Sequence, residues 1–242
     1  MAACGRGAGG MTEFCKELEA LCRQTGYDVS GQALEKMNAY YDCMVETNAK
    51  YNLTAITQPQ DAACKHFFDS IVPYRQIPKG AAVVDIGSGP GFPIAPLKAV
   101  REDILAVAIE SSQKKCNFIE NASFVSGIEV EVICARAEEA GQGRQREAFD
   151  VCVSRAVAAL PVLMELCSPL VKNHGLFFAY KGKYQEELKN AEIAMKALNL
   201  ELEEVIAMPY GTYEHNVLVF RKKGMLSPKY PRRYAQIIKS PL

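Results

Sequence analysis

The sequence lacks several features that would assign it to a specialised class of protein. No apolar run approaches the length of about 18 residues that a membrane-spanning helix needs, so we expect no membrane partner. The nine cysteines include no Cys-x-x-Cys pair and form no metal-like cluster with a histidine, so we expect no metal. With 49% hydrophobic and 23% charged residues, the composition is that of a globular protein. We predict buried thiols in a reducing, cytoplasmic compartment.

Acidic residues are absent from the end of the chain, although the protein as a whole has no net charge. Residues 221–242 hold seven of the 28 basic residues and none of the 28 acidic ones. A basic tail on an acidic body is consistent with a surface that binds phosphates. A solvated terminus without a ligand is the alternative interpretation. At the other end, residues 1–10 are small and glycine-rich, and we expect them to be disordered.

Two common nucleotide-binding motifs are also missing. After the apolar run 81–86 the glycines are spaced Gly87-x-Gly89-x-Gly91, and Phe92 occupies the position where G-x-G-x-x-G requires its last glycine. No P-loop lysine follows. Glycine tolerates positive φ and lets a ligand approach bare backbone, and helical periodicity resumes after the turn. The stretch therefore predicts a strand, a tight turn and a helix at a nucleotide-type site.

Two acidic residues complete this pattern. Asp85 precedes the glycines, and Glu110 ends the next apolar run, 19 residues after Gly91. A carboxylate in the position of Glu110 can accept hydrogen bonds from ribose hydroxyls. The combination resembles the cofactor loop of Rossmann-like methyltransferases that use S-adenosylmethionine, and the resemblance implies that Asp85 orients the turn or the methionine end of the cofactor. A glycine turn with no ligand and an exposed glutamate is the alternative.

The spacing of apolar residues predicts a helical N-terminal extension followed by an α/β domain. The extension, residues 11–78, is expected to hold helices over 11–25, 31–45 and 61–74 and to pack on the core. Strands and helices alternate in the methyltransferase domain, residues 79–242, which predicts a Rossmann-like parallel sheet with helices on both faces and an antiparallel last strand. The predicted strands are 81–86, 104–109, 129–133, 149–153, 175–180, 201–207 and 216–221, and the predicted helices are 93–100, 112–125, 159–171 and 184–199. We interpret 138–146 as a polar loop.

Polar residues follow the later strands of this domain. Arg136-Ala137-Glu138 follows the third strand, where such a fold closes over an adenine, although an ordinary connection with a capping glutamate is possible on the same pattern. Arg155 and Lys181 end the next two strands, and cations there suit an electron-rich base and phosphates. No Asn/Asp-Pro-Pro-aromatic motif of an amine methyltransferase is present.

A series of motifs resembles one family in both content and order. The motifs are Asn52-Leu53-Thr54, His66-Phe67-x-Asp69-Ser70, the loop Asp85 to Pro93, Glu110-Ser111, Arg136-Ala137-Glu138, Ser154-Arg155-Ala156, Lys181-Gly182 and Tyr230-Pro231-Arg232. Over residues 11–242 they are similar to those of bacterial 16S ribosomal RNA guanine-N7 methyltransferases, the glucose-inhibited division protein B family. The resemblance implies methyl transfer from S-adenosylmethionine to N7 of one guanine beside the decoding site. It implies 16S ribosomal RNA or the small ribosomal subunit as the partner, and we expect a monomer.

The resemblance also implies roles for individual residues. Residues that match cofactor contacts of the family, together with those of the glycine pattern, are Asp85, Gly87, Gly89, Gly91, Phe92, Glu110, Ala137, Glu138 and Arg155. Residues that match its polar positions around cofactor and substrate are Asn52, His66, Arg136, Arg155 and Lys181. A structural histidine on an apolar helix is the alternative for His66. The chain departs from the family at Ile94, at Asn216 and in the tail at Arg233-Tyr234-Ala235-Gln236.

Guanine N7 carries an in-plane lone pair and no proton, so the implied reaction needs alignment more than a general base. This agrees with a sequence in which no dedicated base is evident. Two other functions stay open from the residues alone. One is a methyltransferase acting on a small molecule or a protein side chain with the same fold. The other is a cofactor-binding regulatory or assembly protein without turnover.

Overall fold

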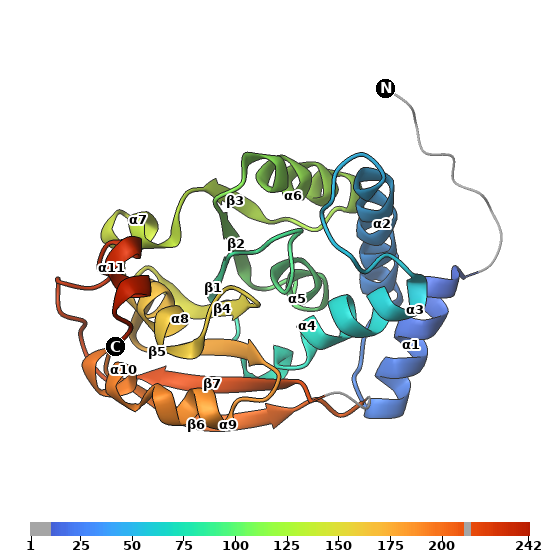
Figure 1. The fold of residues 1–242 in the computed structure, drawn as a ribbon. Helices are drawn as coiled ribbons and strands as arrows, with labels where there is room; N and C mark the ends of the chain where they lie inside the picture. The colour runs from blue at the N-terminus through green and yellow to red at the C-terminus, as the bar shows by residue number, and fades with distance from the viewer. Residues whose placement is uncertain (1–10, 211–213) are drawn as a thin grey trace.

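The structure, a computed structural model, describes residues 11–210 and 214–242, so the predicted disordered terminus at residues 1–10 lies outside the described residues. The strands are β1 Ala82–Ile86, β2 Leu105–Glu110, β3 Glu131–Cys134, β4 Phe149–Arg155, β5 Val171–Lys181, β6 Leu200–Ala207 and β7 Asn216–Lys222. They form one sheet in the order β3-β2-β1-β4-β5-β7-β6 (Figure 1). The strands from β3 across to β5 are parallel, and β7 is antiparallel to both β5 and β6. The predicted parallel sheet with an antiparallel last strand is confirmed.

Helices cover both faces of this sheet. Successive residues of a strand point to opposite faces, so each strand contributes side chains to two cores. Before β3 the helices are α1 Glu13–Thr25, α2 Gly31–Asn48, α3 Pro59–Ala62, the π-helical η1 Ala63–Phe68, α4 Asp69–Ile71, the 3₁₀ turn η2 Tyr74–Gln76, α5 Ile94–Val100 and α6 Gln113–Ser126. After it they are α7 Ala137–Gln142, α8 Leu160–Cys167, the 3₁₀ turn η3 Ser168–Leu170, α9 Gln185–Asn190, α10 Glu192–Ala197 and α11 Tyr234–Lys239. Val83 and Val151 belong to the core shared with α1, α2, α5 and α6, whereas Val84 and Cys152 belong to the core shared with α8 and α10. No helix within the described ranges combines the length and the apolar character needed to cross a membrane.

Capping residues bound the first two helices, and α2 extends to Asn48, three residues beyond its predicted end. Ser30 caps α2 by accepting a hydrogen bond from the backbone N–H of Ala33, and Gly26 ends α1 in the left-handed conformation. Tyr40 of α2 is fully buried, and its hydroxyl donates to the backbone oxygen of Pro90, 3.1 Å away. The helical extension therefore contacts the glycine turn directly.

Four predicted elements differ from the structure. The helix predicted over 159–171 ends at Cys167 and is followed by η3, and β5 begins at Val171. The stretch 138–146 is not a loop throughout, because α7 occupies its first half. Helix 184–199 is broken at Ala191 into α9 and α10. The helix predicted over 61–74 contains a π-helical turn, η1, which is a feature often found at functional sites, and this turn carries Lys65 and His66.

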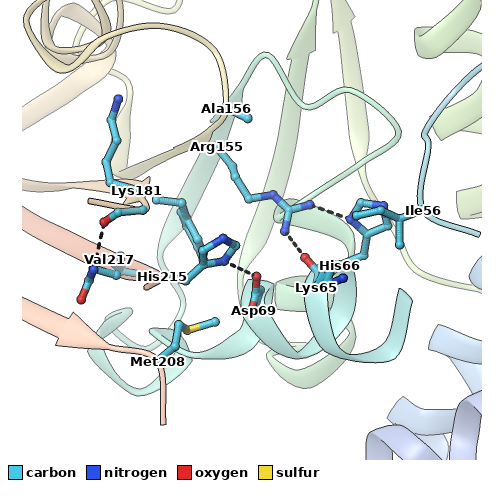
Figure 2. Close-up of a pocket in the computed structure, with 13 residues that line it drawn as sticks. Ile56, Lys65, His66, Asp69, Arg155, Ala156, Lys181, Met208, His215 and Val217 are labelled. Carbon is cyan, nitrogen blue, oxygen red and sulfur yellow. Dashed lines mark hydrogen bonds and ion pairs between the residues drawn. The ribbon is translucent and has the colours of Figure 1, made fainter. Parts of the chain in front are cut away.

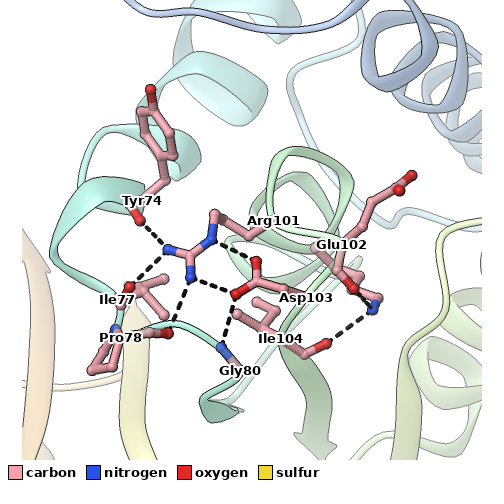
Figure 3. A network of polar contacts seen from close by, with 9 residues as sticks. Tyr74, Ile77, Pro78, Gly80, Arg101, Glu102, Asp103 and Ile104 are labelled. Carbon is pink, nitrogen blue, oxygen red and sulfur yellow. Dashed lines mark hydrogen bonds and ion pairs between the residues drawn. The ribbon is translucent and has the colours of Figure 1, made fainter.

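A polar network fixes the connections on either side of β1 (Figure 3). The guanidinium of Arg101 donates to the backbone oxygens of Tyr74 and Ile77, both at 2.7 Å, and pairs with the carboxylate of Asp103. Asp103 in turn accepts from the backbone N–H of Gly80 at 2.8 Å. The end of α5 is thereby tied to the segment that leads into β1, and this contact fixes the strand that bears the glycine turn.

Several cations of the basic C-terminal segment are held in ion pairs with the rest of the domain, and binding of phosphates by the others stays a prediction. Lys222 is fully buried in β7, where its ammonium contacts Glu147 at 2.6 Å. Arg232 pairs with Glu165, which is also fully buried, at 2.6 Å. Two further cations of this segment, Arg221 and Lys223, form ion pairs with acids of β6. The exposed cations that these pairs leave are Lys229, Arg233 and Lys239.

We expect Arg232→Ala to destabilise the protein by about 3–5 kcal/mol, because the substitution leaves the buried carboxylate of Glu165 without its partner. Lys223→Ala is the matched control, since its ion pairs lie at the surface and should contribute less than about 1 kcal/mol. Urea unfolding followed by circular dichroism measures both values. Equal, small losses for the two variants would show that the tail is not anchored through Glu165.

Candidate active site

The turn after β1 adopts the conformation that its glycines predict. Gly87, Gly89 and Gly91 have φ values of +68°, +57° and +87°, in the left-handed region. A β-carbon on Gly87 would lie 2.5 Å from the side chain of Val157, and one on Gly91 would lie 2.0 Å from the hydroxyl of Tyr40. A β-carbon on Gly89 would meet nothing within 4 Å. Packing therefore requires the outer two glycines, and Gly89 leaves its backbone open to a ligand.

Asp85 lies below this turn and is fully buried. Its Oδ2 accepts a long hydrogen bond, 3.4 Å, from the backbone N–H of Ile94. Its Oδ1 is buried without a hydrogen-bond donor among the described residues. Burial raises the pKa of this carboxyl group to about 7, although the nearby Arg155 acts in the opposite direction. A buried acceptor with no partner is unusual and indicates a place where a ligand can supply a donor.

Glu110 is bound to the glycine turn rather than standing free at the end of β2. Its Oε2 accepts from the backbone N–H of Gly89 and its Oε1 from that of Ser112, both at 2.9 Å. Each carboxylate oxygen has a second lone pair, so these bonds do not exhaust its capacity as an acceptor. Glu110 is 6% exposed. The carboxylate is therefore fixed at the open part of the turn, and its contact with a ribose stays a prediction.

The segment after β3 continues this edge of the sheet. The backbone N–H of Ala135 donates to the backbone oxygen of Glu110 at 3.1 Å. Ala137 and Glu138 form the first turn of α7, and both are half-buried. The side chain of Arg136 is exposed and has no polar partner among residues 11–210 and 214–242. Ala137 and Glu138 thus follow the strand beside Glu110, as predicted, whereas Arg136 lies at the surface.

A cavity of about 500 Å³ lies beside the turn, over the ends of β4 and β5 and the start of β7 (Figure 2). Arg155, at the end of β4, donates to the backbone oxygen of Lys65 at 2.9 Å and to Nδ1 of His66 at 3.3 Å. Its guanidinium carbon lies 5.5 Å from the centre of the Phe92 ring. Phe92 belongs to the glycine turn, so Arg155 joins the cavity to the turn.

His66 is held in one protonation state by its neighbours. Arginine can only donate, so Nδ1 accepts from Arg155, and the proton lies on Nε2, which donates to the Thr54 hydroxyl at 2.8 Å. The ring stacks on Phe92 with centroids 4.7 Å apart. Burial, followed by the charge of Arg155, lowers the pKa of His66 to about 3. A neutral His66 orients Arg155 and is not placed to carry a proton.

We expect the His66 imidazole to stay neutral from pH 5 to pH 8 in long-range ¹H–¹⁵N spectra, with the signature of a proton on Nε2. An unperturbed histidine would instead become protonated within this range, with a pKa of about 6.5. Because the pKa is lower in the folded than in the unfolded protein, the contribution of His66 to stability is present above pH 6.5 and is lost as the pH falls toward 3. A titration midpoint between pH 5 and pH 8 would contradict this assignment.

The other predicted polar residues lie in different surroundings. Lys181 lines the cavity, but its ammonium contacts Glu187 and the backbone oxygen of Ala158, both at 2.7 Å. Figure 2 shows this side chain extending away from His66 and Arg155. Asn52 is exposed on the loop that also carries Thr54. The structure therefore brings His66, Arg155 and Lys181 to one cavity and leaves Asn52 at the surface.

The sequence analysis assigned no role to Asp69 or His215, two residues of the cavity that contact each other. Asp69 is 2% exposed, and its Oδ2 lies 2.7 Å from Nδ1 of His215. Figure 2 shows the two side chains directed toward each other in the middle of the view. Asp69 follows His66 by three residues on the same helical segment, and this spacing could have predicted that both side chains lie on one face of it. His215 comes from the segment just before β7, and no local pattern joins it to Asp69.

Comparisons with known proteins agree with this arrangement. A methyltransferase structure from Aquifex aeolicus, described as SAM-dependent, has a TM-score of 0.52 at 16% identity and covers 66% of this chain and 92% of its own, which shows the fold. Ribosomal RNA small subunit methyltransferase G of Thermoanaerobacter sp. (strain X514) is 41% identical over 216 residues, 86% of this chain and 90% of the relative. The protein of the same description from Bacillus mycoides (strain KBAB4) is 37% identical over 225 residues, 90% and 94% of the two chains. The GidB model, described as rRNA small subunit methyltransferase G, matches residues 33–215, and the chain belongs to this family.

Proposed function

We propose that this protein transfers a methyl group from S-adenosylmethionine to N7 of one guanine in small-subunit (16S) ribosomal RNA, beside the decoding site. One observation carries the proposal. The turn after β1, with its buried and unpartnered Asp85 oxygen, adjoins a base-sized cavity through the contact between Arg155 and Phe92. The family and its relatives, described as acting on small-subunit ribosomal RNA, support the choice of substrate.

The residues at the turn fit S-adenosylmethionine. The cofactor has an ammonium group and two ribose hydroxyls as donors, and the turn presents the carboxylates of Asp85 and Glu110 as acceptors. Ala137 and Glu138 would border the adenine, and Gly89 leaves the backbone open to the ligand. When bound, the cofactor supplies an electrophilic methyl group on a positively charged sulfur. We propose that Asp85, Glu110 and the turn hold it, and that Arg155 and Phe92 mark the boundary with the substrate cavity.

The chemistry of guanine N7 suits the side chains of the cavity. N7 has no proton to lose, so no residue need act as a general base, and orientation alone can lower a barrier by about 7–11 kcal/mol. His66 is neutral and engaged at both nitrogens. Arg155 donates hydrogen bonds to the backbone oxygen of Lys65 and to His66. Its guanidinium has further N–H donors, which can bind the base or a phosphate. The proposed role of these residues is therefore to bind and align the guanine.

A transfer assay tests the proposed activity. Purified protein is incubated with methyl-tritiated S-adenosylmethionine and with small-subunit RNA or intact small subunits from a strain that lacks the gene. We expect label in the RNA, and none in protein or in a metabolite extract from the same cells. Label in protein or metabolites would favour another substrate on the same fold. Cofactor binding without any transfer would favour a regulatory or assembly role.

The exposed cations of the C-terminal segment are proposed as contacts with RNA phosphates, in a monomeric, cytoplasmic enzyme. Substituting alanine for both Arg233 and Lys239 should reduce the slope of log affinity against log salt by about 1–2, because each phosphate contact releases counterions. Filter binding of small-subunit RNA at several salt concentrations measures the slope. Alanine at Lys172, which lies near the start of β5 and pairs with Asp150, is the control and should leave the slope unchanged. Parallel lines for the tail variant and the wild type would remove this segment from the RNA interface.

A further inference from the structure

The cavity contains one carboxylate that the proposed reaction does not use. Asp69 is the single acidic side chain among the described residues that line it. His215 binds Oδ2 of this carboxylate, and no residue in 11–210 or 214–242 donates a hydrogen bond to Oδ1. The side chain is 3% exposed, so it is held firmly and reaches the cavity with little contact to bulk water. An acceptor in this setting favours a ligand that carries N–H donors.

Guanine carries such donors on one edge. Its N1–H and its exocyclic N2 amine form a pair of donors on the Watson–Crick edge, whereas adenine presents an acceptor at N1 and has no N2 amine. Enzymes that act on an unstacked base recognise it through this edge. Hydrogen bonding to a buried polar group also rejects an analogue that lacks the matching donor more strongly than an apolar pocket can.

We propose that Asp69 selects guanine by accepting hydrogen bonds from its N1–H and N2 amine. This assignment rests on the proposed function and names the residue that determines its base specificity. His215 is a positioning residue, because it fixes the carboxylate from the mouth of the cavity, where its own side chain is 43% exposed.

The surroundings of Asp69 agree with a base lying in the cavity. Ile56, Met208 and Val217 provide apolar walls for the faces of a purine ring. The competing polar groups are already engaged: the Tyr180 hydroxyl donates to the backbone oxygen of Ser70 at 2.7 Å, and the ammonium of Lys181 contacts Glu187. Arg155 lies on the side of the cavity that adjoins the glycine turn. A guanine with its Watson–Crick edge on Asp69 can therefore present another edge toward the turn.

The test combines a substitution in the enzyme with one in the substrate. Two small-subunit RNAs are assembled by ligation, one with guanosine and one with inosine at the methylated position; inosine lacks only the N2 amine. We expect wild-type kcat/KM to be about 10- to 100-fold higher for guanosine, within the discrimination expected for a paired contact to a base. In Asp69→Asn, kcat/KM for guanosine should fall by a similar factor, and the ratio of guanosine to inosine should approach 1.

Two controls separate selection of the base from damage to the fold. Asp150→Asn makes the same chemical change at the opposite edge of the sheet and should keep the wild-type ratio. Asp69→Asn should bind S-adenosylmethionine with wild-type affinity in calorimetric titration. A wild-type enzyme that methylates both RNAs equally would overturn the assignment without any variant. So would an Asp69→Asn enzyme that loses activity equally on both RNAs. A wild-type enzyme inactive on both would instead refute the proposed function, and the assignment with it.

Discussion

Replacing Asp85 with asparagine is expected to stabilise the folded protein at pH 8 while weakening its affinity for S-adenosylmethionine. Burial raises the pKa of this carboxyl group to about 7 in the folded protein, from an ordinary value of 3.8. A pKa raised by folding means that the contribution of the group to stability is fully present below about pH 4 and is lost as the pH rises through 7. At pH 8 the buried charge costs about 4 kcal/mol, an order-of-magnitude figure from about 1.4 kcal/mol per pKa unit.

The difference in unfolding free energy between Asp85→Asn and the wild type isolates this effect. It should be small near pH 3, where the carboxyl group is mostly protonated in both states, and should reach a few kcal/mol in favour of the variant at pH 8. Asp103→Asn is the matched control with the opposite sign. Hydrogen bonds from Arg101 lower the pKa of Asp103, so its contribution is present above pH 4, and the variant should lose stability there (Figure 3). A difference for Asp85→Asn that does not change with pH would contradict the burial of an ionising group.

The same variant should bind S-adenosylmethionine about 10- to 100-fold more weakly, because a hydrogen bond to a charged group contributes about 1.5–3 kcal/mol. Calorimetric titration at pH 8 measures this loss directly. A gain in stability together with a loss of binding is the pattern expected when a buried charge is retained for its ligand. Unchanged affinity would show that Asp85 only shapes the turn.

Gly91→Ala is the second change for which we expect a large effect, a loss of stability of about 2–4 kcal/mol. The new β-carbon would lie 2.0 Å from the hydroxyl of Tyr40, a fully buried residue that is bonded to the turn itself. Inserting a group into a packed core costs about 1–3 kcal/mol, and the left-handed conformation adds about 1–2 kcal/mol for a residue with a side chain.

Gly89→Ala provides the comparison, because its β-carbon meets nothing within 4 Å and only the backbone strain applies. Gly89→Ala should lose about 1 kcal/mol of unfolding free energy. If the cofactor approaches the backbone at Gly89, the same variant should also bind the cofactor more weakly. Urea unfolding and calorimetric titration of the two variants together distinguish packing from ligand approach. If Gly91→Ala proves no more destabilising than Gly89→Ala, helix α2 does not support the turn in the way that the structure indicates.

The sequence predicted the features of the fold and site that depend on neighbouring residues. Asp85, the three glycines and Glu110 lie within 26 residues and adopt the expected strand and turn conformations. Apolar periodicity likewise predicted the sheet and most helices, because each element buries one face or stripe. The helix α7 was not predicted because Gly141 is typical of a loop, and in the structure this glycine lies where α7 packs closely against Pro169 and Pro231.

Contacts between distant residues could not be predicted in this way. The ion pairs of the C-terminal cations could not be predicted from local sequence, because Lys222 lies 75 positions from Glu147 and Arg232 lies 67 positions from Glu165. The pair formed by Asp69 and His215 spans 146 positions. Only the folded chain brings the helix before the sheet against the segment before its last strand, and it is this contact that completes the cavity.

Nucleoside analysis of the reacted RNA tests the central claim most directly. Small-subunit RNA from a strain that lacks the gene is treated with the protein and S-adenosylmethionine, digested and analysed by mass spectrometry, and the modified position is mapped by cleavage at 7-methylguanosine. We predict one new 7-methylguanosine per RNA, in the loop beside the decoding site. A methyl group on another atom or another base, or no methylated nucleoside at all, would contradict the account.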